Sequence, residues 1–168
     1  MKFDQYRISA DIKKNLENLG FKRPTDIQYK AIPSIMKGED VLAIAQTGTG
    51  KTAAFAIPII DRIHHQKSSK RNEGIKCLVM VPTRELAMQI GEVFTAIAKH
   101  TRTKAFALYG GVEQDPQIKK LQEGLDILIT TPGRMFDLIN QGYINLAGVD
   151  TLVLDEADHM LDLVLLKT

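Results

Sequence analysis

Five short apolar runs along the chain predict buried strands, because a strand that is covered on both faces carries apolar side chains throughout. The stretches between these runs repeat apolar positions at intervals of three and four residues, which is typical of amphipathic helices. Strands that alternate with helices in this order predict a three-layer α/β fold with a mostly parallel sheet. The five runs lie at residues 41–45, 78–81, 105–109, 125–130 and 151–154.

Two helices are predicted before the first of these strands. Ser9 is placed to cap the first helix, Leu19 falls on its apolar face and Gly20 ends it. Thr25 and Gln28 have the spacing of a capping box at the start of the second helix. The spacing alone therefore gives Gln28 a structural role.

The segment 64–74 is polar and basic. Its basic run at 67–71 resembles a nucleic-acid patch, but a solvated loop is the simpler interpretation. His64 and His65 are adjacent and lack ligand spacing to any other His or Cys, so no metal site is predicted there. The later helices are expected to begin near Thr52, Pro82, Asp115 and Thr131.

The segment between the first strand and the helix that follows it carries the chemistry of a phosphate site. A glycine-rich turn with Gly-Lys-Thr at a helix start directs backbone N–H groups and the positive end of the helix toward an anion. Lys51 is then placed to reach the β and γ phosphates, and Thr52 to bind Mg²⁺. Ala45 stands where the general pattern has its first glycine. The candidate residues are Ala45, Gln46, Thr47, Gly48, Thr49, Gly50, Lys51 and Thr52.

Two adjacent carboxylates follow the last predicted strand. In a phosphate-binding fold an acid at this place holds Mg²⁺, often through water, and this role falls to Asp155. Glu156 is placed to orient or deprotonate the water that attacks the γ-phosphate. Asp158 is as readily explained by a helix start as by catalysis. The candidate catalytic residues are therefore Lys51, Asp155 and Glu156, and the candidate magnesium ligands are Thr52 and Asp155.

The composition of the chain limits the classes of protein to which it can belong. The chain has 168 residues, 44% of them hydrophobic and 25% charged, which is ordinary for one globular domain. A net charge of +2 excludes a global basic field, so a nucleic acid would have to be held by a local patch. The single Cys77 excludes an internal disulfide and falls at a predicted strand, where burial is expected. No apolar run approaches the roughly 18 residues of a membrane span and no apolar leader is present, so a cytoplasmic location is expected.

The order of these motifs resembles the first RecA-like domain of DEAD-box ATP-dependent RNA helicases, with the general look of their bacterial RhlE-like branch. The segment 20–28 resembles the Q motif of the family, with Phe3 at its upstream aromatic position. The segment 45–52 is similar to the family's P-loop, which carries alanine at its start, and 155–158 reads Asp-Glu-Ala-Asp. The resemblance covers residues 3 to about 162.

The resemblance implies ATP with Mg²⁺ as the ligand. From the residues alone, Gln28 either caps its helix or holds a purine, because an amide offers a donor and an acceptor while Phe21 offers a ring for stacking. The resemblance favours the second role and assigns adenine to Phe21, Arg23 and Gln28.

The resemblance also implies sequence-nonspecific contacts to the backbone of single-stranded or duplex RNA. Helix N-termini and glycine amides bind phosphates without reading the sequence, so the physical chemistry agrees. Without the family, the segment 131–134 would be interpreted only as a turn and a helix start. The implied RNA-binding residues are Pro82, Thr83, Arg84, Gly110, Gly111, Thr131, Pro132, Gly133 and Arg134.

The last residues depart from the family pattern, which continues to a strand ending in Ser-Ala-Thr and to a second RecA-like domain. Residues 161–168 instead read Leu-Asp-Leu-Val-Leu-Leu-Lys-Thr. We hypothesise a frameshift over 163–168, since loss of one G converts a family-like Leu-Gly-Phe-Ile-Lys-Asp into this ending; the gene sequence beyond this point tests it. The expectation is a single RecA-like domain without its last strand, binding nucleotide with little turnover. The alternatives are a nucleotide-switched RNA- or protein-binding module without catalysis, and another P-loop NTPase such as a DNA translocase.

Overall fold

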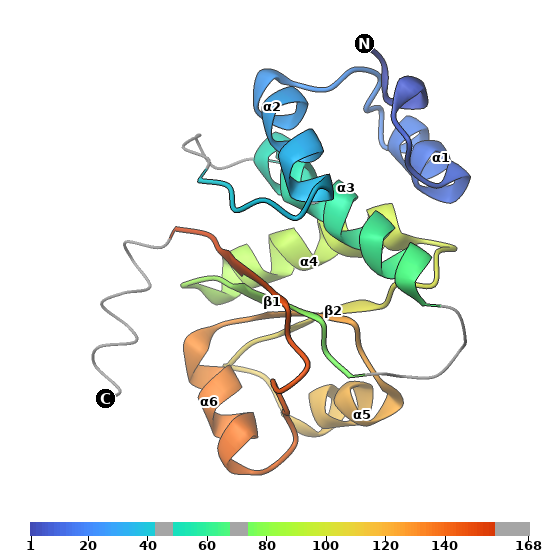
Figure 1. Ribbon diagram of the computed structural model, residues 1–168. Helices are drawn as coiled ribbons and strands as arrows, with labels where there is room; N and C mark the ends of the chain where they lie inside the picture. The colour runs from blue at the N-terminus through green and yellow to red at the C-terminus, as the bar shows by residue number, and fades with distance from the viewer. Residues whose placement is uncertain (43–48, 68–73, 157–168) are drawn as a thin grey trace. The chain divides into compact units, whose positions relative to one another are not determined.

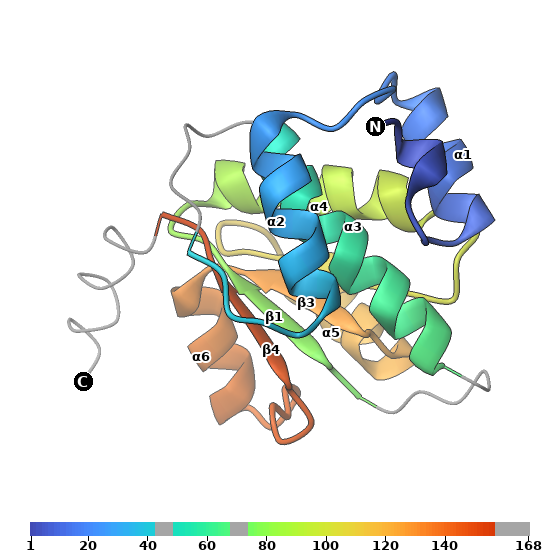
Figure 2. The ribbon, with the colours of Figure 1, turned by 45° about the horizontal axis from the view of Figure 1, so that its top comes forward.

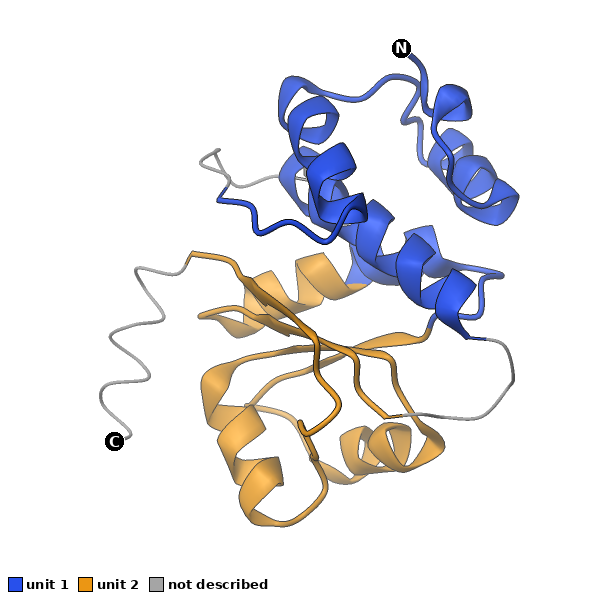
Figure 3. Ribbon diagram, viewed as in Figure 1, with its two compact units in different colours: residues 1–70, 92–103 blue, residues 71–91, 104–168 orange. Residues whose placement is uncertain are grey.

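The computed structural model describes residues 1–42, 49–67 and 74–156 (Figure 1). The chain divides into two compact units, which Figure 3 colours separately. Unit 1 consists of Met1–Lys70 and Glu92–Thr103, and unit 2 of Arg71–Gly91 and Lys104–Thr168.

Unit 2 contains a four-stranded parallel sheet with the strand order β2-β3-β1-β4 (Figure 2). The central pair is in register, with Met80 opposite Thr130, and Met80 also lies opposite Leu154 of the outer strand. The carboxyl ends of all the strands therefore meet at one edge. The strands are β1 (Cys77–Met80), β2 (Ala105–Leu108), β3 (Ile127–Thr130) and β4 (Thr151–Leu154).

Helices α5 (Asp115–Glu123) and α6 (Pro132–Asn140) pack their apolar sides on one face of this sheet. The resulting core combines side chains from strands and helices, which buries the continuous apolar runs of the sequence. Its members include Leu78, Met80, Leu108 and Leu128 from the strands and Ile118, Met135 and Leu138 from the helices.

Helix α4 (Arg84–Ala98) makes a close approach to β2 through Gly91. A Cβ atom at this position would lie 2.8 Å from the Cβ of Ala107, a separation that real Cβ atoms do not tolerate. Glycine is less favourable than alanine in a helix by about 1 kcal/mol. The close packing against Ala107 of β2 explains why glycine stands at this position despite its lower helix propensity.

Unit 1 is helical and contains α1 (Ala10–Asn18), α2 (Asp26–Met36) and α3 (Thr49–Gln66), after the short 3-10 helix η1 (Phe3–Gln5). Asn15 of α1 is buried and donates from its amide to the carbonyl oxygens of Ile97, at 2.8 Å, and Lys99, at 2.7 Å. These carbonyls belong to the end of α4, where backbone acceptors lack partners within the helix. The first helix thus caps the fourth.

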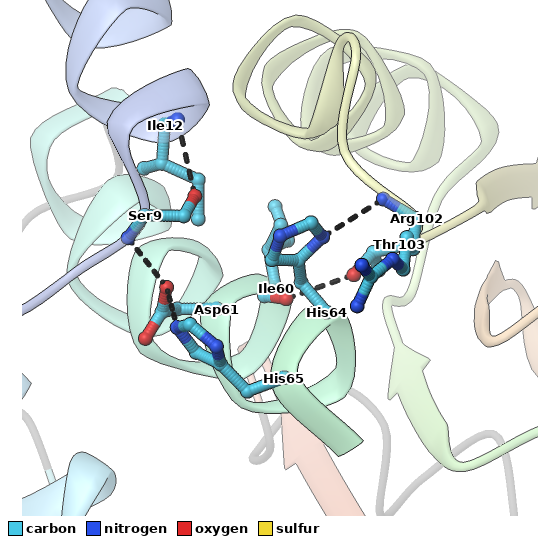
Figure 4. Close-up of polar contacts among 8 residues, drawn as sticks. All are labelled: Ser9, Ile12, Ile60, Asp61, His64, His65, Arg102 and Thr103. Carbon is cyan, nitrogen blue, oxygen red and sulfur yellow. Dashed lines mark hydrogen bonds and ion pairs between the residues drawn. The ribbon is translucent and has the colours of Figure 1, made fainter. Parts of the chain in front are cut away.

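A polar cluster connects the start of α1 to the last turns of α3 (Figure 4). The carboxylate of Asp61 is buried, accepts the backbone N–H of Ser9 at 2.8 Å and lies 3.2 Å from Nε2 of His65. One turn away, Nδ1 of His64 accepts the backbone N–H of Arg102 at 2.9 Å. Both interactions fix segments of unit 1 that are far apart in sequence.

Four of the five predicted strands are present. The predicted strand at 41–45 is not formed at Val41 and Leu42, which have no ladder partner in the described sheet and are 41% and 90% exposed; its other three residues lie outside the described ones. β4 pairs with β1, and the described residues supply no partner along its second edge. Along this strand Leu152 and Leu154 are 57% and 50% exposed.

The helices follow the predictions closely. Ser9 caps α1 as expected, because its hydroxyl accepts the N–H of Ile12 at 3.3 Å. Leu19 does not join the apolar face, since the helix has ended and the side chain is exposed. His64 and His65 lie in the last turn of α3, not in a loop. Within the part of the chain that the structure describes, no helix combines the length and apolarity needed to cross a membrane.

The position of His64 predicts a pH-dependent stability. Burial lowers the pKa of His64 below its ordinary value of 6.5, Arg102 and His65 lower it further, and Asp61 and Asp11 oppose them. The unfolded chain therefore binds this proton more readily than the folded chain. The free energy of unfolding that this group contributes is present above pH 6.5 and is lost as the pH falls below that value.

Urea unfolding of the variant His64→Asn at several pH values measures this effect. Asparagine does not titrate and offers an amide oxygen in place of Nδ1, so its stability should fall less than that of the wild type on acidification. His100→Asn is the matched control, because His100 is exposed and has a positive φ of 66° that asparagine tolerates. Equal pH slopes for His64→Asn and the wild type would show that His64 is not responsible.

Candidate functional site

Gln28 is the third residue of α2 and forms the predicted capping box with Thr25. The backbone N–H of Thr25 donates to Oε1 of Gln28 at 3.0 Å, and the backbone N–H of Gln28 donates to the Thr25 hydroxyl at 3.4 Å. The amide of Gln28 also reaches α3, where Nε2 donates to the carbonyl of Gly50 at 2.9 Å. The cap of one helix is therefore tied to the first turn of the next.

The described residues engage only part of the hydrogen-bonding capacity of Gln28. An amide has two N–H hydrogens and an oxygen with two lone pairs, and the described residues engage one of each. Gln28 is fully buried, so a base reaches it only where covering atoms move aside. Phe21 is half-buried and Arg23 exposed, just beyond the end of α1.

The predicted phosphate-binding segment falls partly outside the described residues. Residues 45–48 are among those outside, and Thr49 is described as the first residue of α3. The predicted helix is therefore present, and it begins at Thr49. In the first turn of the helix Lys51 is half-buried and Thr52 is buried.

Two helices of unit 2 begin side by side at the carboxyl edge of the sheet. α4 follows β1 and is capped by Thr83, whose hydroxyl accepts the N–H of Leu86 at 3.2 Å. α6 follows β3, with Thr131 at its N-cap and Pro132 in its first turn. Because β1 and β3 are neighbours in register, the positive ends of the two helices share this edge.

Arg84 lies over the segment that follows β2. Its guanidinium carbon is 5.6 Å from the ring centroid of Tyr109, which is a cation–π contact. A Cβ at Gly111 would come within 3.0 Å of Nη1 of Arg84, and Gly111 has a positive φ of 79°. The backbone conformation therefore favours glycine at this position, and a side chain there would also displace the end of Arg84 by a few tenths of an ångström.

Arg134 reaches the same segment from α6. Its Nη2 donates to the carbonyl of Val112 at 2.8 Å. Its Nη1 is buried and has no acceptor among the described residues. The guanidinium carries a positive charge near the edge where two helices begin.

Asp155 continues β4 beyond its last residue. Its backbone N–H donates to the carbonyl of Met80 at 3.1 Å, so the main chain still pairs with β1, and the residue is buried. Glu156 has a positive φ of 52°, a left-handed conformation that costs a residue with a side chain about 1–2 kcal/mol. Such strained positions concentrate at functional sites. Asp158 lies outside the described residues.

The structure thus brings some of the predicted residues close together within each unit. In unit 1, Gln28 joins the first turn of α3. In unit 2, the ends of the four strands bring together the segments at 82–84, 109–112, 131–134 and 155–156. The sequence did not indicate Tyr109, although an aromatic residue before two glycines was the available signal.

Comparisons with known proteins agree with this arrangement. The pattern of the family described as DEAD/DEAH box helicase matches residues 25–166. The chain is 41% identical over 161 residues to the DEAD-box ATP-dependent RNA helicase CshA of Bacillus cereus, covering 96% of this chain and 30% of that protein. It is 42% identical over 162 residues to the ATP-dependent RNA helicase DBP2 of Encephalitozoon cuniculi, covering 96% of this chain and 33% of that protein.

The fold agrees as well. The crystal structure of a DEAD box protein from the hyperthermophile Methanococcus jannaschii superposes with a TM-score of 0.84 at 40% sequence identity, over 99% of this chain and 44% of that chain. Its similarity supports the RecA-like α/β fold. The chain belongs to the DEAD/DEAH box helicase family, and it spans about a third of the length of the curated relatives given above.

The two hydrogen bonds of the Gln28 amide predict a large penalty for the variant Gln28→Glu. A carboxylate keeps the acceptor for Thr25 but places an oxygen and a buried charge against the carbonyl of Gly50. We expect a loss of about 3 kcal/mol in the free energy of unfolding, measured with urea. Thr25→Ala is the control and should cost about 1 kcal/mol, as for other helix caps. Equal losses for the two variants would contradict a role for the Gly50 contact.

Proposed function

We propose that this chain is the ATP- and RNA-binding domain of a DEAD-box RNA helicase, in which ATP hydrolysis is coupled to the unwinding of RNA duplexes by the full-length protein. The observation that carries the proposal is the common carboxyl edge of the sheet in unit 2. Two helix N-termini, a pair of glycines, two arginines and the adjacent acids Asp155 and Glu156 follow strands that end there. Membership of the family and the names of the relatives support it.

In this proposal the nucleotide is ATP. Residues 45–52 hold its phosphates, with Lys51 neutralising charge as the phosphoryl group leaves. Phe21, Arg23 and Gln28 hold the adenine, and the donor and acceptor of the Gln28 amide that no described residue engages provide the specificity. The fixed bond from Gln28 to Gly50 links recognition of the base to the helix that follows the phosphates.

The predicted magnesium ligands are oxygen donors, the kind that Mg²⁺ takes in proteins. Among the described residues there is no group of three or more His, Cys, Asp or Glu side chains that could hold a metal alone. Mg²⁺ in phosphoryl-transfer sites relies instead on one or two protein oxygens, water and the phosphates. The buried hydroxyl of Thr52 and the buried carboxylate of Asp155 are such oxygens. The metal would neutralise phosphate charge, while Glu156 orients or deprotonates the attacking water.

RNA is held through its backbone in this proposal. Backbone N–H groups at the starts of α4 and α6 and in the glycine pair bind phosphates without reading bases. Arg84 and Arg134 add positive charge at the same edge. The residues involved are Pro82, Thr83, Arg84, Gly110, Gly111, Thr131, Pro132, Gly133 and Arg134. An RNA partner and a single buried cysteine fit a cytoplasmic location.

The variant Lys51→Ala tests nucleotide binding by this chain. Loss of the ammonium should weaken binding of Mg-ATP by about 10- to 100-fold in calorimetry, the range expected for a charge-assisted hydrogen bond to phosphate. Lys30→Ala, an exposed lysine of α2, is the control and should bind as the wild type does.

We expect the chain to hydrolyse little ATP with or without RNA. Rapid ATP hydrolysis that RNA stimulates and that Lys51→Ala abolishes would contradict the expected low turnover.

The variants Arg84→Ala and Arg134→Ala test RNA binding. Each should weaken binding of single-stranded RNA to a similar extent for all sequences and reduce the slope of log affinity against log salt by about 0.7. Fluorescence anisotropy at several salt concentrations measures both quantities. Lys119→Ala, an exposed lysine of α5, should keep the wild-type slope. Tighter binding of DNA than of RNA would favour a DNA translocase instead.

A further inference from the structure

The segment 109–112 is held by three side chains from three different helices. Arg84 of α4 stacks on the ring of Tyr109. Arg134 of α6 donates to the carbonyl of Val112 at 2.8 Å. Gln117 of α5 donates from Nε2 to the carbonyl of Tyr109 at 3.2 Å. Two of these side chains are proposed RNA ligands, whereas the third is buried and cannot be one directly.

Tyr109 restricts the guanidinium of Arg84. An arginine side chain carries about 2 kcal/mol of rotamer entropy, and binding a phosphate with a free arginine loses much of it. Stacking on a half-buried ring removes part of this freedom before any ligand arrives. A ligand binds more tightly to a preorganised group because less conformational entropy is lost when it binds.

Gln117 fixes the main chain that carries this ring. The residue is only 5% exposed and lies in the first turns of α5, and its amide bond to Tyr109 holds the backbone at the end of β2. Oε1 of Gln117 is buried without a partner among the described residues. A buried acceptor without a partner costs about 1–3 kcal/mol, which a leucine at this position would avoid. The bond from Nε2 to the Tyr109 carbonyl is the contact that such a leucine would lose.

We propose that Tyr109 and Gln117 are positioning residues for RNA binding: Gln117 fixes the carbonyl of Tyr109, and the ring of Tyr109 aims the guanidinium of Arg84 across Gly111 at the RNA backbone. This inference rests on the proposed RNA-binding function. It adds two residues that do not contact RNA to the set that determines affinity. Both act through Arg84, so their effects depend on the presence of that arginine.

A double-mutant cycle tests this dependence. Tyr109→Leu should weaken binding of single-stranded RNA about 3- to 10-fold, the range of a cation–π contact, whereas Tyr109→Phe keeps the ring and should bind as the wild type does. In the background Arg84→Ala, Tyr109→Leu should have no further effect. A side chain that only stabilises the fold would weaken binding equally in both backgrounds, and that result would overturn the inference.

Gln117→Met extends the cycle, because methionine has a similar shape but cannot donate to the Tyr109 carbonyl. It should weaken RNA binding by less than Tyr109→Leu and add nothing in the Arg84→Ala background. ATP affinity, measured on the same samples, should not change. Wild-type RNA affinity for Gln117→Met would overturn the assignment of Gln117.

Arg84→Lys keeps the test decisive if Tyr109→Leu fails to fold. Lysine keeps the positive charge but lacks the planar group that stacks, so it should lose as much affinity as Tyr109→Leu. Arg84→Lys with wild-type affinity would overturn the inference while leaving RNA binding intact. If the wild-type chain binds no RNA, the proposed function and this inference fall together; if only Arg84→Ala weakens binding, the inference alone falls.

Discussion

The candidate site of unit 2 depends on the parallel, in-register pairing of β1 with its two neighbours. Met80 lies opposite both Thr130 and Leu154, so three strands end at the same level. Every helix or loop that follows must then begin at the same edge. Antiparallel pairing or a shift in register would separate these segments, and no single side chain could compensate for that. The sheet is therefore the scaffold of the site as well as of the core.

Strands and caps were predictable because their signals are local. Continuous apolar runs identified four strands, and the spacing of Thr25 and Gln28 identified a capping box that the structure contains. The strand prediction was wrong at Val41 and Leu42, because apolar character alone does not supply a neighbouring strand to pair with. Family resemblance, and not spacing, indicated which loops carry function.

Long-range contacts were not predictable from one sequence. The stacking of Arg84 on Tyr109 joins residues that belong to different elements, and no periodicity relates their positions. The same holds for the bond between Gln28 and Gly50, which connects a helix cap to the turn of another helix. In both cases a residue that the sequence presents as structural or unremarked contacts a residue of a candidate site.

The close approach of Gly91 to Ala107 has a consequence for how variation acts on this protein. Gly91 and Arg84 belong to the same helix, about 10 Å apart along its axis at 1.5 Å per residue. A methyl group at Gly91 would push this rigid rod away from β2 and carry the guanidinium with it. A substitution at this buried glycine can therefore weaken ligand binding even though every residue that contacts the ligand is unchanged.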